Sequence, residues 1–292
     1  MTELRNGGLI RVQVHAGRTL GWVLPVWAAL CGAVASGDFV LSAVGGGRLL
    51  IVFLLVEAGW GTVWSALATT DWATPIRRWR NWSMDVRLAL LPYAQPGSPG
   101  YRSARWLAQL RAWWRQIVVP TVGSSVGKVM VGLAMSLILA AAAAPELAML
   151  SLAAFALMQL ALVLERGRGQ PPLGWDCAFR VGLPWLAGHL AFTPLSLPSV
   201  ALAMVFSTTV AGAGAVDRRW RRILWTGGQL CAASLLILLH RPLAALFLTL
   251  LLSPQWLLAA WSPRTTSSNP PGWIRRSWPW LVAGMLLSAW AL

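Results

Sequence analysis

Charge is scarce in this 292-residue chain: only 11% of the residues are charged, 57% are hydrophobic, and the mean hydropathy is +0.61. A soluble domain carries about a quarter charged residues. The composition therefore excludes an ordinary soluble globular domain. No polar segment is long enough to fold alone, so we expect a single polytopic membrane domain over residues 1–292.

Cysteine and histidine are equally rare, with three of each. Cys31, Cys177 and Cys231 lie singly in or beside different apolar stretches, and no CxxC or Cys/His spacing occurs. This argues against a disulfide framework and against a cysteine–histidine metal site. Three scattered histidines are also too few for a haem or quinone scaffold that uses several of them. A cleavable signal peptide is not apparent, because the first apolar stretch follows a polar arm of about 19 residues and lacks a small-residue cleavage site.

Long apolar stretches dominate the rest of the chain. A run of about 20 apolar residues crosses the bilayer core as a helix, because lipid offers no partner for unpaired backbone groups. The sequence therefore predicts an all-α integral membrane protein with nine transmembrane helices. The predicted spans are 20–37, 47–69, 126–144, 146–164, 177–194, 197–215, 223–239, 243–261 and 278–292.

The arginines predict the direction of each span. The net charge is +15, and the arginines gather in the amino-terminal arm and in every second gap between spans. The other gaps and their edges hold only Arg48 and Arg241. Positive residues stay on the cytoplasmic side during insertion. We therefore expect a cytoplasmic amino terminus and an external carboxyl terminus, with a bacterial inner membrane as the location. The same distribution argues against nucleic acid as a partner.

The largest predicted cytoplasmic loop spans 70–117, and its second half reads as an amphipathic helix over 103–118. Trp106, Leu110, Trp113, Trp114 and Ile117 recur there at helical spacing, and the arginines fall largely on other faces. Such a helix is suited to lie in the membrane interface on anionic lipid. A lid over a cavity is the alternative.

Tryptophan is unusually common, with 20 residues against 2 tyrosines and 7 phenylalanines. Indole favours the headgroup layer, where its ring is in contact with apolar groups and its N–H meets water. We therefore expect most of the tryptophans at predicted span ends to anchor the protein in lipid. These are Trp22, Trp60, Trp72, Trp175, Trp225, Trp261, Trp278 and Trp280.

Ionisable residues in or beside the spans are the candidates for chemistry, since a charge in lipid is costly. Glu57 lies near the middle of the second span, and Lys128 and Arg180 lie near the cytoplasmic starts of the third and fifth. Asp71 ends the second span and Asp217 ends the sixth. Glu57 either is protonated and bonded to a neighbouring helix or faces a polar cavity.

Four of these groups share the predicted cytoplasmic face, which predicts a site for a metal-bound diphosphate. Carboxylates would bind Mg²⁺, and cations would neutralise phosphate. Asp71 and Asp217 are the predicted metal ligands. Lys128 and Arg180, together with Arg218 and Arg221, are the predicted phosphate ligands. The alternative is that the cations reach towards lipid headgroups and the carboxylates pair with adjacent arginines.

This layout resembles the UbiA superfamily of intramembrane prenyltransferases. The resemblance rests on the nine spans, on an acid at the ends of the second and sixth spans, and on the stretch from Gly182 to the arginines after Asp217. It implies binding of a polyprenyl diphosphate through Mg²⁺ at two aspartate-rich motifs, and transfer of the prenyl group to an aromatic or ring acceptor. The prenyl tail and the acceptor would lie among the helices near Glu57.

The two motifs depart from the family pattern. Alignment of Asp71 with the central aspartate of the first motif places Leu67 and Pro75 at its asparagine and second aspartate, and the second motif would read Asp217 to Arg221. A non-catalytic protein of this fold therefore stands beside the enzyme as an alternative. It would bind lipid, pigment or another isoprenoid within a larger membrane protein complex. A transporter or channel is a third class, but the outer halves of the spans are poor in polar residues and show no clear repeat.

Overall fold

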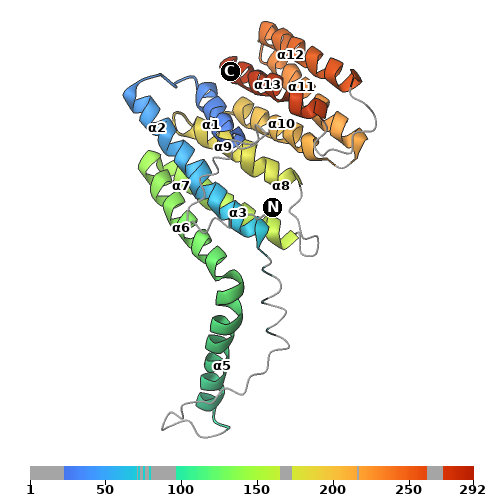
Figure 1. Cartoon of the computed structure of the whole chain (residues 1–292). Coiled ribbons are helices and arrows are strands. Elements are labelled where there is room, and N and C mark those ends of the chain that lie inside the picture. Colours follow the sequence, from blue (N-terminus) through green and yellow to red (C-terminus); the bar gives the residue numbers. More distant parts are fainter. Residues whose placement is uncertain are drawn as a thin grey trace, which may run out of the picture.

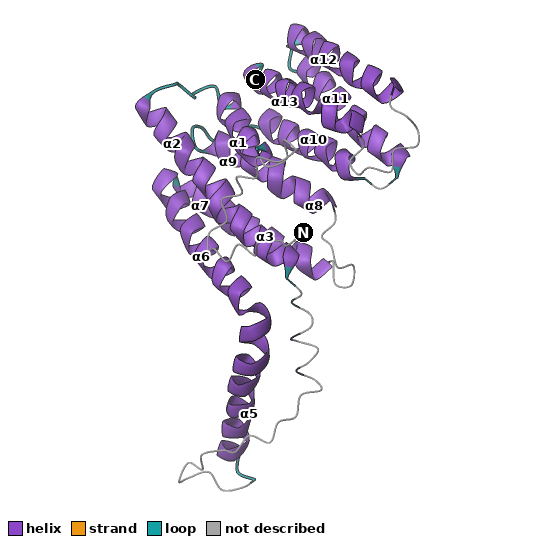
Figure 2. Cartoon of the chain, in the orientation of Figure 1, coloured by secondary structure: helices purple, strands orange, loops and turns teal. Residues whose placement is uncertain are grey.

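A computed structural model of the chain describes residues 23–70, 72, 75, 79, 97–164, 173–215, 217–261 and 272–292, without the side chains of Leu173 and Arg218. Within these residues every regular element is a helix (Figure 2), which confirms the all-α class. The elements, with π-helical turns marked η, are α1 (Leu24–Ala35), α2 (Ala43–Leu54), η2 (Leu55–Trp60), α3 (Gly61–Thr69), α5 (Pro99–Trp113), η3 (Trp114–Val118), α6 (Val119–Ala143), α7 (Pro145–Leu164), α8 (Leu173–Cys177), η4 (Ala178–Gly182), α9 (Leu183–Leu190), α10 (Leu197–Gly214), α11 (Arg218–Leu238), α12 (Pro242–Trp261) and α13 (Gly272–Trp290).

Five helices of the described part are long and apolar enough to cross a membrane: Ala43–Thr69, Pro99–Ala143, Pro145–Leu164, Leu197–Gly214 and Pro242–Trp261. A helix also lies over each of the other four predicted spans. Helix α1 has only 12 residues, or about 18 Å against a hydrocarbon core of about 30 Å. Crossing by these four helices stays a prediction.

The sequence sets the helix starts through proline and short polar side chains. Proline begins or nearly begins several helices, where its missing N–H costs nothing because the first turn has no internal partner. Ser42, Ser98, Ser196 and Asp217 each cap the following helix through a side-chain oxygen that accepts a backbone N–H. Each cap satisfies a donor that the first turn leaves unpaired.

The helices pack as two groups (Figure 1). One contains α2, α3, α6 and α7, and the other contains α10 to α13. Helices α1 and α9 pack against each other between the groups, and residues from both contribute to each of the two hydrophobic cores.

Glycines allow several of these helices to approach closely. A Cβ added to Gly32 of α1 would overlap the Trp185 carbonyl, and one added to Gly188 of α9 would overlap the Ala29 carbonyl. Membrane helices use such small residues at their contacts, because dispersion and close packing replace the hydrophobic effect in lipid.

The predicted amphipathic helix is present, but it does not stand alone. Helix α5 runs through η3 into α6 as one 45-residue helix, roughly 68 Å long. Figure 1 shows α5 extending beyond the bundle, and no residue of α5 is buried. Trp113, the last residue of α5, contacts two residues that come before this helix in the sequence. Its ring centroid lies 5.2 Å from that of Trp79, and its N–H donates to the Pro75 carbonyl at 3.3 Å.

The expectation that most span-end tryptophans anchor in lipid is wrong for three of them. Trp60, Trp225 and Trp278 are only 2%, 1% and 7% exposed. The Trp60 N–H donates to Ser151 Oγ at 3.3 Å, and the Trp225 N–H donates to Gln255 Oε1 at 2.8 Å. An indole is stable in the interior when its single donor finds a partner there, and these rings join helices. Trp261 is 82% exposed, and its anchoring in lipid stays a prediction.

Candidate ligand cavity between two π-helical turns

Of the three π-helical turns in the described residues, η2 and η4 lie on opposite sides of one cavity. In the first, the Gly61 N–H bonds to the Val56 carbonyl, and in the second the Leu183 N–H bonds to that of Ala178, each five residues back. Pro184 has no N–H for the Arg180 carbonyl, so the regular helical ladder cannot run unbroken there. Such π-helical turns occur often at functional sites.

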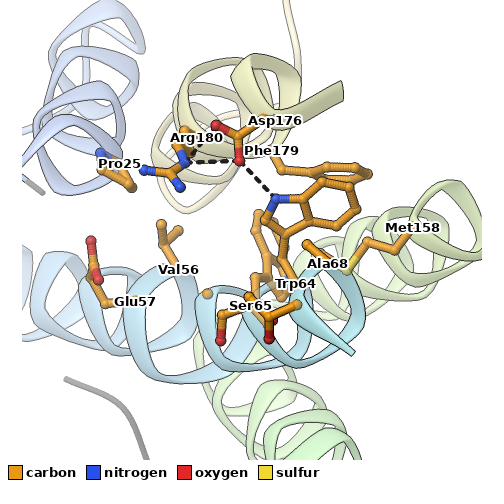
Figure 3. A pocket seen from close by; sticks show the side chains of 13 residues that line it. Pro25, Val56, Glu57, Trp64, Ser65, Ala68, Met158, Asp176, Phe179 and Arg180 are labelled. Atoms are coloured by element: carbon orange, nitrogen blue, oxygen red, sulfur yellow. Dashed lines mark hydrogen bonds and ion pairs between the residues drawn. The ribbon is translucent and has the colours of Figure 1, made fainter. Parts of the chain in front are cut away.

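The cavity between these turns has a volume of about 180 Å³. Its walls come from the start of α1, from η2 and α3, from α7, and from α8 and η4. Figure 3 shows Trp64, Phe179 and Met158 on one side and Glu57 with Pro25 on the other. The lining is therefore aromatic and aliphatic around a small number of charged groups.

Asp176 and Arg180 form an ion pair at the edge of the cavity. The Arg180 Nε lies 2.9 Å from Asp176 Oδ2 and donates to Oδ1 at 3.0 Å. The Trp64 N–H also donates to Oδ1, at 2.9 Å. The carboxylate thus holds the arginine of its own helix and the indole of α3 together (Figure 3). The ring of Trp64 packs on Phe179 with centroids 4.3 Å apart, which fixes this wall further.

Glu57 lines the opposite side of the cavity, and its environment is incomplete. Its Oε1 atom is buried and has no hydrogen-bond partner among the described residues. Arg180 is close enough to act electrostatically on this carboxyl group, but its Nε is bonded to Asp176. A buried oxygen without a donor costs about 1–3 kcal/mol. The cavity therefore contains an acceptor that a bound molecule can satisfy.

Among the predicted site residues that the structure describes, two lie together in the cavity. Glu57 and Arg180 line the same cavity, whereas Lys128, which is half-buried on α6, does not. Asp217 is exposed and caps α11, with its Oδ1 accepting the Arg219 backbone N–H at 2.8 Å. Arg221 donates from Nε to the Ala215 carbonyl at 2.9 Å, at the same junction between α10 and α11.

Asp71 and the side chain of Arg218 lie outside the described residues, so the predicted magnesium pair stays a prediction. Asp217 alone does not fit a magnesium cage, because its described contact is to its own helix. In the part of the chain that the structure describes, no three His, Cys, Asp or Glu side chains converge as metal ligands.

Sequence reasoning missed Asp176 and Trp64. Asp176 stands at the edge of the predicted fifth span, four residues before Arg180, which is the spacing of helical ion pairs. That spacing was a usable signal. The contact of Trp64 with Asp176 joins residues 112 positions apart, and no local pattern could reveal it.

No protein-family model, curated protein or solved structure matches this chain. The function must therefore be inferred from the cavity itself.

Proposed function

We propose that this protein is a membrane-embedded binding protein whose cavity receives the polar end of an isoprenoid or a similar amphipathic lipid. The observation that supports it best is the placement of Glu57 and Arg180, from two facing π-helical turns, in one aromatic-walled cavity. Ligand pockets typically combine apolar walls with a few convergent polar groups.

The size of the cavity favours a head-group site. A volume of about 180 Å³ is below the roughly 300–1,000 Å³ of pockets that enclose a drug-sized ligand. It accommodates a head group and the first few carbons, while a longer chain would extend into lipid. Thr69 and Asp176 both line the cavity, at the ends of α3 and α8 that the arginine pattern assigns to the cytoplasmic side. The cavity would accordingly open towards the cytoplasm.

Binding should depend on free space in the cavity. Gly61 lines it, so Gly61→Leu should fill the space and weaken binding of radiolabelled geranylgeranyl compounds to the purified protein in lipid nanodiscs by about tenfold or more. Gly46→Leu is the matched control, because Gly46 lies earlier in the same continuous helix with nothing within 4 Å of an added Cβ. The absence of saturable binding, or equal affinities in wild type and Gly61→Leu, would contradict the proposed function.

Prenyl transfer in a divergent protein of UbiA-like layout is the second candidate. It is favoured by the position of Asp217 and Arg221, which both lie at the junction of α10 and α11. The same nanodisc assay distinguishes it from simple binding. Consumption of geranylgeranyl or farnesyl diphosphate that requires Mg²⁺ and is lost in Asp217→Ala would establish the enzyme, whereas stable bound ligand without turnover supports the binding protein.

The proposed orientation in the inner membrane has its own test. In a Cys231→Ser background, Gly100→Cys at the start of α5 should react with an impermeant maleimide only after the cells are permeabilised. Asp38→Cys, between α1 and α2, should react in intact cells. Cys31 and Cys177 are buried and should stay silent. Labelling of Gly100→Cys in intact cells would reverse the orientation.

A further inference from the structure

The charges around the cavity indicate which kind of head group it binds. Arg180 is the one cation among the described residues that line it, and its guanidinium is already bonded to Asp176. The Trp64 N–H is also bonded to that carboxylate. The donors on this wall are therefore occupied in part, and the lining carries two carboxylates against one guanidinium.

One acceptor in the cavity lacks a hydrogen-bond donor. Glu57 Oε1 is buried without a partner, on the side of the cavity opposite the Asp176–Arg180 pair (Figure 3). A diphosphate would supply only acceptors, so it would leave Glu57 Oε1 without a donor and add negative charge beside Asp176. A hydroxyl or ammonium group would instead donate to Glu57 and leave the ion pair intact.

We infer that the cavity binds its lipid through an O–H or N–H donor on the head group, held by Glu57, and not through phosphate. This inference rests on the proposed function, since it names the chemistry of the ligand for the same cavity. The aromatic wall of Trp64 and Phe179 packs against the carbons next to that donor. Polyprenols, prenylated phenols and long-chain amines have this chemistry.

Four ligands with the same hydrocarbon chain test the inference: geranylgeraniol, its methyl ether, geranylgeranyl diphosphate and geranylgeranylamine. In wild-type protein the alcohol should bind about tenfold or more tightly than the ether, because only the alcohol gives the buried Glu57 Oε1 a donor, and a buried acceptor left unpaired costs about 1–3 kcal/mol. The diphosphate should bind more weakly than the alcohol. Geranylgeranylamine provides the N–H arm and should bind at least as well as the alcohol.

Two variants test which residues cause these differences in affinity. Glu57→Leu removes both carboxylate oxygens and should bring the affinity for the alcohol down to that for the ether. Asp176→Asn keeps an acceptor for Trp64 but frees Arg180, so it should raise the affinity for the diphosphate, relative to that for the alcohol, by about tenfold or more. Asp38→Asn, an exposed acid between α1 and α2, is the control and should change neither affinity.

The outcomes separate the inference from the proposed function. Equal binding of alcohol and ether, or tighter binding of diphosphate, would overturn the donor inference, even if Gly61→Leu still blocks the cavity. Loss of all saturable, Gly61-sensitive binding would remove the proposed function itself. The comparison of ligands in wild-type protein decides the matter even if Glu57→Leu does not fold.

Discussion

Gly188→Ala should lower the apparent Tm of the purified protein by about 5 °C or more, from a loss of about 2 kcal/mol or more. The added methyl group would overlap the Ala29 carbonyl of α1, and a backbone carbonyl cannot rotate away as a flexible side chain can. The helices α1 and α9 would have to separate, and with them the two groups of helices that they join.

Gly227→Ala is the matched control for this prediction. Gly227 lies within α11, and an added Cβ would meet nothing within 4 Å. Alanine is favoured over glycine in a helix by up to about 1 kcal/mol, so this variant should unfold at or above the wild-type temperature. The two variants make the same chemical change and are expected to shift Tm in opposite directions. An unchanged Tm in Gly188→Ala would show that α1 and α9 do not approach so closely.

The apolar stretches predict where the helices lie, because membrane crossing leaves the backbone no alternative to a helix. They do not predict where the helices are widened. Pro120 stands at the first turn of α6, and a proline there suggests a break between the predicted loop helix and the third span. The π-helical turn η3 precedes it, and a widened turn has room for the proline ring, so the helix continues. The predicted interfacial helix thereby became the extension of a span.

The candidate site was likewise predictable in part: two of its residues could be named from the sequence, but their contacts could not. Glu57 and Arg180 could be named from the sequence because a charge inside an apolar stretch is conspicuous. Their meeting in one cavity depends on how α3, α8 and η4 pack, which the sequence pattern does not reveal. The phosphate site was predicted from charged residues near span ends on the same predicted side of the membrane. That pattern does not determine whether their side chains meet. Asp217 caps α11, as a carboxylate at the start of a helix commonly does. Its position in the sequence is therefore explained without a metal ion.

The tryptophans show that the sequence pattern does not predict the direction in which a side chain points. A residue near the end of an apolar stretch is near the membrane surface along the helix axis, but its direction around the axis depends on the neighbouring helices. Trp225 points inward because α12 offers it an acceptor, Gln255 Oε1. Such pairings between distant side chains can be predicted only once the packing of the helices is known.

Gln255→Leu is the second variant with a large expected effect. The Gln255 and Gln229 amides bond to each other in both directions, at 2.9 and 3.1 Å, and Gln255 Oε1 also accepts the Trp225 N–H at 2.8 Å. Both glutamines are 1% exposed. Removal of Gln255 leaves the Trp225 N–H and Gln229 Oε1 unpaired in the interior, at a cost of about 3 kcal/mol, while Gln229 Nε2 keeps its bond to the Trp225 carbonyl. Thr249→Val on the same helix is the control, since its hydroxyl is exposed and bonds only to the Leu246 carbonyl.

The order of the effects tests the network more sharply than any single value. Gln229→Leu should cost less than Gln255→Leu, because Trp225 keeps its acceptor when only Gln229 is lost. The double variant should cost less than the sum of the two single variants by about 1 kcal/mol, since the bonds between the two amides are then lost once and not twice. Unfolding in detergent, followed for all three variants, gives this coupling energy directly. Additive losses would mean that α11 and α12 are not joined by the amide pair, and that their contact depends on the surrounding apolar side chains alone.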